Sequence, residues 1–117
     1  MAVDFMIDIN QNLKDYFENW KEYAEVIKEK SEEILKDKNL RVYVFGSIVK
    51  GQYHSYLSDI DVAVVSEKLP KEASTRGKIL GELSKSLGMG NPFEIHLLSP
   101  ELWKLWYLKF IDKFVEF

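Results

Sequence analysis

The chain has 117 residues, 46% of them hydrophobic and 30% charged, with a formal net charge of −3 at pH 7. These values are typical of one globular domain, and the acidic balance disfavours nucleic-acid binding, which usually needs a basic surface. No apolar run approaches the roughly 20 residues of a membrane span, and the first residues contain no basic leader. Together with the absence of cysteine, these features predict a cytoplasmic protein without a nucleic-acid or membrane partner.

The first predicted element is one long amphipathic helix over residues 9–37. Apolar residues recur there at helical spacing, charged residues fill the other face, and no proline interrupts the pattern. The β-branched and aromatic run LRVYVF at 40–45 then predicts a buried strand that ends at Gly46. A segment from Gly46 to Ser58 leads into a second predicted strand, DIDVAVV, at 59–65.

The second half of the chain predicts a helix, a strand and a last helix. The first of these helices begins at Pro70 and ends at Gly88, and FEIHLL at 93–98 is the third strand. Ser99 and Pro100 are typical of a helix start, so the last helix is expected over residues 100–115. The order of elements predicts a single α/β domain over residues 1–117, with a small mixed three-stranded sheet flanked by helices.

Two carboxylates stand in the apolar second strand. Asp59 and Asp61 are two residues apart and therefore share a face, while Ile60 and Val62 point the opposite way. Carboxylates held that close repel each other unless a cation lies between them, and Mg²⁺ prefers such oxygen ligands. A pair of this kind is also short and common, and a solvated strand end explains it equally well.

The third strand adds another acid. Glu94 and His96 lie on the face opposite the apolar residues of FEIHLL. If the second and third strands are neighbours in the expected register, Glu94 joins the two aspartates. Three carboxylates can bind two metal ions, or one metal ion and an attacking hydroxyl. For His96 we favour a half-exposed strand histidine over a residue of the site.

The Gly46-Ser47 turn follows the first strand. Glycine lets the backbone approach a ligand closely, and free N–H groups with a serine hydroxyl suit phosphate oxygens. The turn alone is uninformative. Followed by Asp59 and Asp61 on a strand, it indicates phosphoryl or nucleotidyl transfer.

This arrangement resembles the minimal nucleotidyltransferases (MNT) of the DNA polymerase β-like superfamily. The matching signature is Gly46-Ser47, eleven intervening residues and Asp59-Ile60-Asp61. The resemblance runs from about residue 42 to 98 and implies the polymerase-β-like nucleotidyltransferase fold, with the catalytic strands and loop at 40–98.

The resemblance also implies a role for each matching residue. The Gly46-Ser47 turn holds the triphosphate, and Asp59 and Asp61 bind magnesium and position the nucleotide. Glu94 is the third acid, either a metal ligand or the general base. Lys50 stands where family members often carry a basic residue, and it would contact the triphosphate. Tyr53, His54 and Tyr56 either touch the nucleotide or only close the loop.

The implied reaction transfers a nucleoside monophosphate to an acceptor hydroxyl and releases pyrophosphate. The family implies ATP as the nucleotide, although another nucleoside triphosphate fits the residues equally well, and two Mg²⁺ ions as cofactors. Minimal members are often antitoxins that modify a tyrosine of a HEPN-domain toxin. Two alternatives stay open: a non-catalytic module that binds nucleotide and neutralises its partner by contact, and an enzyme acting on a small molecule.

The last predicted helix has a wide apolar face. Projected at ~100° per residue, its large apolar side chains cover an arc of roughly 200°, about twice what one core needs. The surplus either covers the domain's own core or forms a protein interface. We favour the interface, with a HEPN-domain partner or a second copy of the chain.

Overall fold

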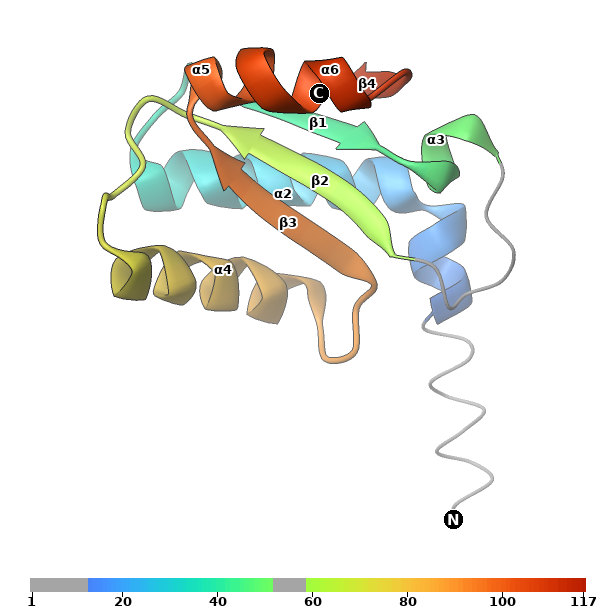
Figure 1. The fold of residues 1–117 in the computed structure, drawn as a ribbon. Helices are drawn as coiled ribbons and strands as arrows, with labels where there is room; N and C mark the ends of the chain where they lie inside the picture. Colours follow the sequence, from blue (N-terminus) through green and yellow to red (C-terminus); the bar gives the residue numbers. More distant parts are fainter. Residues whose placement is uncertain (1–12, 52–58) are drawn as a thin grey trace.

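The computed structural model describes residues 13–51 and 59–117, without the side chain of Trp106. The chain forms an α/β fold with a mixed sheet and flanking helices, as predicted (Figure 1). No helix in these two stretches is long and apolar enough to cross a membrane. The elements are α2 (Trp20–Leu35), β1 (Arg41–Phe45), α3 (Ser47–Lys50), β2 (Ile60–Val65), α4 (Ala73–Leu87), β3 (Phe93–Leu98), α5 (Pro100–Leu102), the π-helical segment η1 (Trp103–Tyr107), α6 (Leu108–Phe110) and β4 (Phe114–Glu116).

The N-terminal helix is interrupted, whereas the sequence predicts one continuous helix over 9–37. Residues 13–18 are helical, the helix breaks at Asn19, and α2 begins at Trp20. The Asn19 side chain donates a hydrogen bond to Asp15 Oδ1 over 2.7 Å, which is the local bonding that makes asparagine a weak helix former. At the other end, Lys36 adopts a left-handed conformation and stops α2. The predicted residues 9–12 lie outside the described residues.

The sheet has the order β3-β2-β1-β4. Strand β1 runs antiparallel to β2 and to β4, and β2 runs parallel to β3. The parallel pair needs a crossover, which α4 provides; this helix begins at Ala73 rather than at Pro70. The three predicted strands are confirmed within a residue at each end, and β2 and β3 are neighbours, as the prediction for Glu94 required.

The prediction for the C-terminal segment is wrong in two respects. The helical stretch that starts at Pro100 ends at Phe110, and β4 pairs with the free edge of β1, making the sheet four-stranded instead of three-stranded. The alternating run FVEF suits a strand: Phe114 packs edge-on against Tyr43 on one face, and Phe117 against Trp20 on the other. Helical periodicity and strand alternation cannot be distinguished over so short a run, and the unpaired edge of β1 decides between them.

Each face of the sheet is covered by a different layer. Helices α2 and α4 lie against one face, and the C-terminal segment α5–η1–α6 lies on the other (Figure 1). The first layer encloses a mostly aliphatic core with Val62 and Val64 of β2 at its centre. The second is smaller and aromatic, and the Tyr43 and Trp103 rings stack in it at 4.3 Å.

Part of the wide apolar face predicted for the last helix therefore packs against the domain's own sheet. Trp103 is buried and Tyr107 and Ile111 pack beside it on the sheet. Other apolar side chains of the same segment stay in solvent, among them Leu105, which is 61% exposed.

Candidate functional site

The strand register brings two of the predicted acids together. Asp61 of β2 is paired with Glu94 of β3, and the next residue of β3 on that face, His96, is paired with Ala63. One ligand atom from each of Asp61, Glu94 and His96 lies within 4.8 Å of the other two. We call these three residues the acidic cluster. The prediction that Glu94 shares a face with Asp61 is confirmed.

His96 contacts the Asp61 carboxylate. Its Nε2 atom lies 3.5 Å from Asp61 Oδ1, within ion-pair range, but this buried atom makes no regular hydrogen bond to the described residues. The Asp61 carboxylate raises the pKa of His96, Glu94 adds to that effect, and burial of the ring opposes it. Sequence reasoning favoured a half-exposed histidine outside the site, and the structure places it in the cluster.

Gly46 lies directly against Asp61. Its φ of 91° belongs to a region that side-chain-bearing residues rarely adopt, and a Cβ atom there would stand 2.8 Å from Asp61 Oδ2. No other residue fits this position without moving the carboxylate. The turn that the sequence assigns to phosphate binding is thus next to the acid that it assigns to metal binding.

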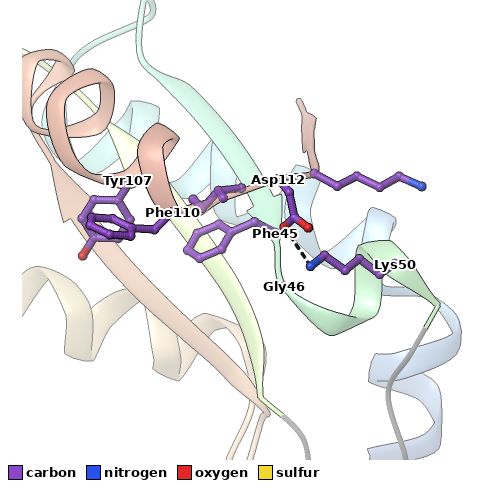
Figure 2. A pocket seen from close by; sticks show the side chains of 8 residues that line it. Phe45, Gly46, Lys50, Tyr107, Phe110 and Asp112 are labelled. Carbon is purple, nitrogen blue, oxygen red and sulfur yellow. Dashed lines mark ion pairs between the residues drawn. The ribbon is translucent and has the colours of Figure 1, made fainter.

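Lys50 ends the short helix α3 and contacts the C-terminal segment. Its Nζ atom lies 2.8 Å from Asp112 Oδ1, and the hydrogen bond from Lys50 lowers the pKa of Asp112. This ion pair stands at the rim of a pocket of about 460 Å³ (Figure 2). The pocket is lined by Phe45, Gly46, Lys50, Tyr107, Phe110, Ile111, Asp112 and Lys113.

The remaining predicted site residues are more dispersed. Ser47 is the first residue of α3, directly after Gly46. Asp59 is exposed at the residue before β2 and, among the described residues, it is not part of the group whose ligand atoms approach within 4.8 Å. Tyr53, His54 and Tyr56 lie outside the described residues.

The donor set of the acidic cluster fits a divalent cation. Asp61 and Glu94 offer carboxylate oxygens on one face of the sheet, and the Nε2 atom of His96 is buried beside them. Side chains of Asp61 and His96 are 29% and 25% exposed, whereas Glu94 is 54% exposed. An ion held there would be partly shielded from water and open toward solvent on the Glu94 side, where a ligand can approach.

Sequence reasoning missed the aromatic pocket as well as His96. The sequence assigns Phe45 only to the buried strand, and Tyr107 and Phe110 only to the apolar face of the last helix. The alternation of β1 could have indicated that Phe45 lies near the site. Phe45 shares a face with Tyr43 and, across the sheet, with Asp61. Nothing in the sequence indicated that the chain turns at Ile111 and returns Asp112 to Lys50.

Comparison with known proteins identifies the class. A family model described as nucleotidyltransferase domain matches residues 26–116, and the chain belongs to that family. The crystal structure of a protein assigned as a nucleotidyltransferase is 33% identical, with a TM-score of 0.63 over 80% of this chain and 95% of that one. A second such protein, from Sulfolobus solfataricus, is 18% identical and shares the fold, with a TM-score of 0.53 over 91% of this chain and 86% of that one. No curated protein matches.

The family assignment confirms the polymerase-β-like nucleotidyltransferase fold and the resemblance to minimal nucleotidyltransferases. The matched stretch contains the Gly46 turn, the acidic cluster and the segment that lines the pocket.

Proposed function

We propose that the protein transfers a nucleoside monophosphate, AMP from ATP in the first instance, to the hydroxyl of an acceptor. The observation that carries this proposal is the register of β2 and β3, which sets Asp61 beside Glu94 with the Gly46 turn against Asp61. A phosphate-binding turn next to paired carboxylates is the arrangement that phosphoryl transfer chemistry requires.

Asp61, with Asp59 from the residue before β2, would hold Mg²⁺, and Glu94 would either complete this metal site or act as the general base. Bound Mg²⁺ neutralises charge on the phosphates and orients them. The Gly46-Ser47 turn would bind phosphate oxygens through backbone N–H groups and the serine hydroxyl. His96 would keep Asp61 oriented through their 3.5 Å contact.

The acceptor oxygen forms a bond to the α-phosphorus, and the bond from that phosphorus to the β-phosphate oxygen breaks, so pyrophosphate leaves. Glu94 is the most exposed member of the acidic cluster and is therefore placed to take the proton from the acceptor hydroxyl.

We further propose that the acceptor is a tyrosine of a HEPN-domain toxin and that the protein acts as its antitoxin in the cytoplasm. The support is a set of three leucines of the C-terminal segment that stay in solvent, which we call the leucine row and which would be covered by a partner. Leu102, Leu105 and Leu108 are 37%, 61% and 37% exposed and follow each other at a spacing of three residues. A second copy of this chain is the alternative occupant of that surface.

Co-purification with HEPN-domain proteins from the same source, followed by intact-mass analysis, tests this function. We expect the partner to gain the mass of one nucleoside monophosphate on a tyrosine. The Asp59→Asn/Asp61→Asn variant should form the same complex without the mass gain. If that variant still neutralises the partner, the protein is a binding module and the transfer proposal is wrong.

A second pair of variants tests the leucine row. Leu105→Glu should abolish the complex, because a charge would be buried at the interface. Met89→Glu is the matched control, since Met89 is fully exposed at the turn before β3, far from the C-terminal segment in the chain. Equal complex formation by both variants would exclude the leucine row as the docking surface.

A further inference from the structure

The pocket beside the acidic cluster has two chemically different ends. Figure 2 shows the rings of Phe45, Tyr107 and Phe110 on one side and the Lys50–Asp112 ion pair on the other. Its volume of about 460 Å³ is in the range of small-molecule sites. The aromatic end suits a flat ring system. The other end suits phosphates, because it contains a lysine and a glycine that lets the backbone approach a ligand closely.

We propose that this pocket binds the base and sugar of the nucleoside triphosphate, with the base stacked on the aromatic rings. The proposal rests on the proposed function, because it takes the phosphates to be held at Gly46. Gly46 is common to the phosphate-binding turn and the pocket wall. A nucleotide bound at that turn therefore has its base and sugar within reach of the pocket.

The rings also connect the pocket to the acidic cluster. The Tyr107 ring centroid lies 6.3 Å from that of Phe45 and 5.7 Å from that of His96, and Phe45 lies 5.8 Å from His96. The ring contacts thus run from the pocket to His96, whose Nε2 atom lies 3.5 Å from Asp61. A molecule stacked on the rings can place its phosphates beside Gly46 and its α-phosphate near Asp61.

The composition of the lining predicts how selective this pocket is. Among the described residues that line it, the aromatic end offers ring faces, Ile111 and one hydroxyl, on Tyr107, while the charged side chains belong to the phosphate end or the rim. Every base has a π-face, so stacking tolerates all of them. We expect the affinities of ATP, GTP, CTP and UTP to differ by less than about tenfold.

Phe110 is the residue with which to test the pocket. Its side chain is 76% exposed, so truncation should leave the fold intact, and it comes from α6, outside the acidic cluster. Loss of one stacking ring reduces affinity by about fivefold or more. Phe110→Trp preserves a stacking surface, and Met89→Ala removes an exposed apolar side chain elsewhere.

The experiment is calorimetric titration of the full chain with ATP, UTP and inorganic tripolyphosphate in the presence of Mg²⁺. Phe110→Ala should weaken ATP and UTP about fivefold to tenfold and leave tripolyphosphate unchanged, whereas Phe110→Trp and Met89→Ala should bind all three like the original chain. If Phe110→Ala binds ATP normally, the base-pocket proposal is wrong and the proposed function stands. If Phe110→Ala binds ATP normally but labels the acceptor more slowly, the pocket binds the acceptor and not the base. In that case too, the base-pocket proposal is wrong and the proposed function stands. If the original chain binds neither ATP nor tripolyphosphate, the proposed function fails and the base pocket with it.

Discussion

The two ends of the β1–β2 pair contain aspartates with opposite surroundings. At one end, Asp37 is 5% exposed, and its two oxygens accept hydrogen bonds from Ser66 Oγ at 2.6 Å and from the Asn39 N–H at 2.9 Å. At the other end, Asp61 lies beside another carboxylate and a histidine that is not aligned for a hydrogen bond. Among the described residues, the carboxylate at one end accepts two regular hydrogen bonds, whereas the one at the other end has a second carboxylate and a histidine as neighbours.

The difference shows how to separate structural from functional acids in this fold. Hydrogen bonds favour the ionised form, and the Ser66 hydroxyl lowers the pKa of Asp37 although its burial opposes this. Asp37 therefore needs nothing further and stabilises the junction before β1. Asp61 and Glu94 instead face each other with His96 between them, whose Nε2 atom lies 3.5 Å from Asp61 and 4.0 Å from Glu94, and a bound cation would relieve the repulsion between the two carboxylates further.

The largest expected effect follows from Asp61→Asn. Asparagine has the same shape but one fewer anionic ligand atom, so we expect the nucleotidyl transfer rate to fall at least ~1,000-fold. The unfolding free energy should change by less than about 1 kcal/mol, since loss of the His96 contact and relief of repulsion from Glu94 act in opposite directions. Single-turnover labelling and thermal melting measure the two quantities. Unaltered transfer would show that Asp61 is not part of the site.

The reverse pattern is expected for Asp37→Ala. This change leaves the Ser66 hydroxyl and the Asn39 N–H without their acceptor, and should reduce the unfolding free energy by about 1–3 kcal/mol. Transfer activity below the melting temperature should be unaffected, because Asp37 stands at the opposite end of β1 and β2 from Asp61. Urea unfolding with a parallel activity assay gives both values. A variant that unfolds normally but transfers poorly would reverse the assignment of the two ends.

We expect Asp37 to contribute to the loss of stability at acidic pH. The folded-state pKa of Asp37 is below its unfolded value, so the unfolded chain binds more protons between the two values and stability rises with pH there. This contribution is complete above the unfolded pKa and is lost as pH falls through the folded pKa. Melting curves in acidic buffers should therefore fall less steeply for Asp37→Asn than for the original chain. Parallel curves would mean that Asp37 does not contribute to the acid dependence.

The smallest effect is expected for Asp112→Asn, at the rim of the pocket. Asp112 is exposed and pairs with Lys50, and such pairs contribute little to stability. The melting temperature should stay unchanged, while tripolyphosphate binds about twofold more tightly because Lys50 is no longer neutralised. Calorimetry detects this change. When Lys50→Ala is added to both, the original chain and Asp112→Asn should bind tripolyphosphate equally. Weaker binding by Asp112→Asn would show that Lys50 does not face the phosphates.

The sequence was sufficient for the parts of the site that rest on strand alternation. FEIHLL and DIDVAVV place Asp61 and Glu94 on one face because neighbouring side chains alternate, and the buried apolar residues fix the register. Alternation puts His96 on the same face but does not show that it contacts Asp61. The Gly46 turn was also predictable from its position after a strand. Each of these inferences depends on a local pattern in the sequence and not on contacts between distant segments.

The rest depends on contacts between distant segments. The chain leaves the last helix at Ile111 because β1 has an open edge that β4 can pair with, and local periodicity carries no information about that edge. The pocket follows from the same turn, which returns Asp112 to Lys50. The break at Asn19 is a local competition between the asparagine side chain and the helix, and an apolar periodicity that continues across it conceals the break.

The most direct test of the central claim is incubation of the purified protein with Mg²⁺ and ATP labelled on either the α- or the γ-phosphate, alone and with cell extract from its source. The account predicts that α-label becomes covalently attached to an acceptor, that γ-label appears only in pyrophosphate, and that Asp61→Asn abolishes the α-signal. Attachment of γ-label, or α-labelling that survives Asp61→Asn, would contradict the assignment of Asp61 and Glu94 as a nucleotidyl transfer site.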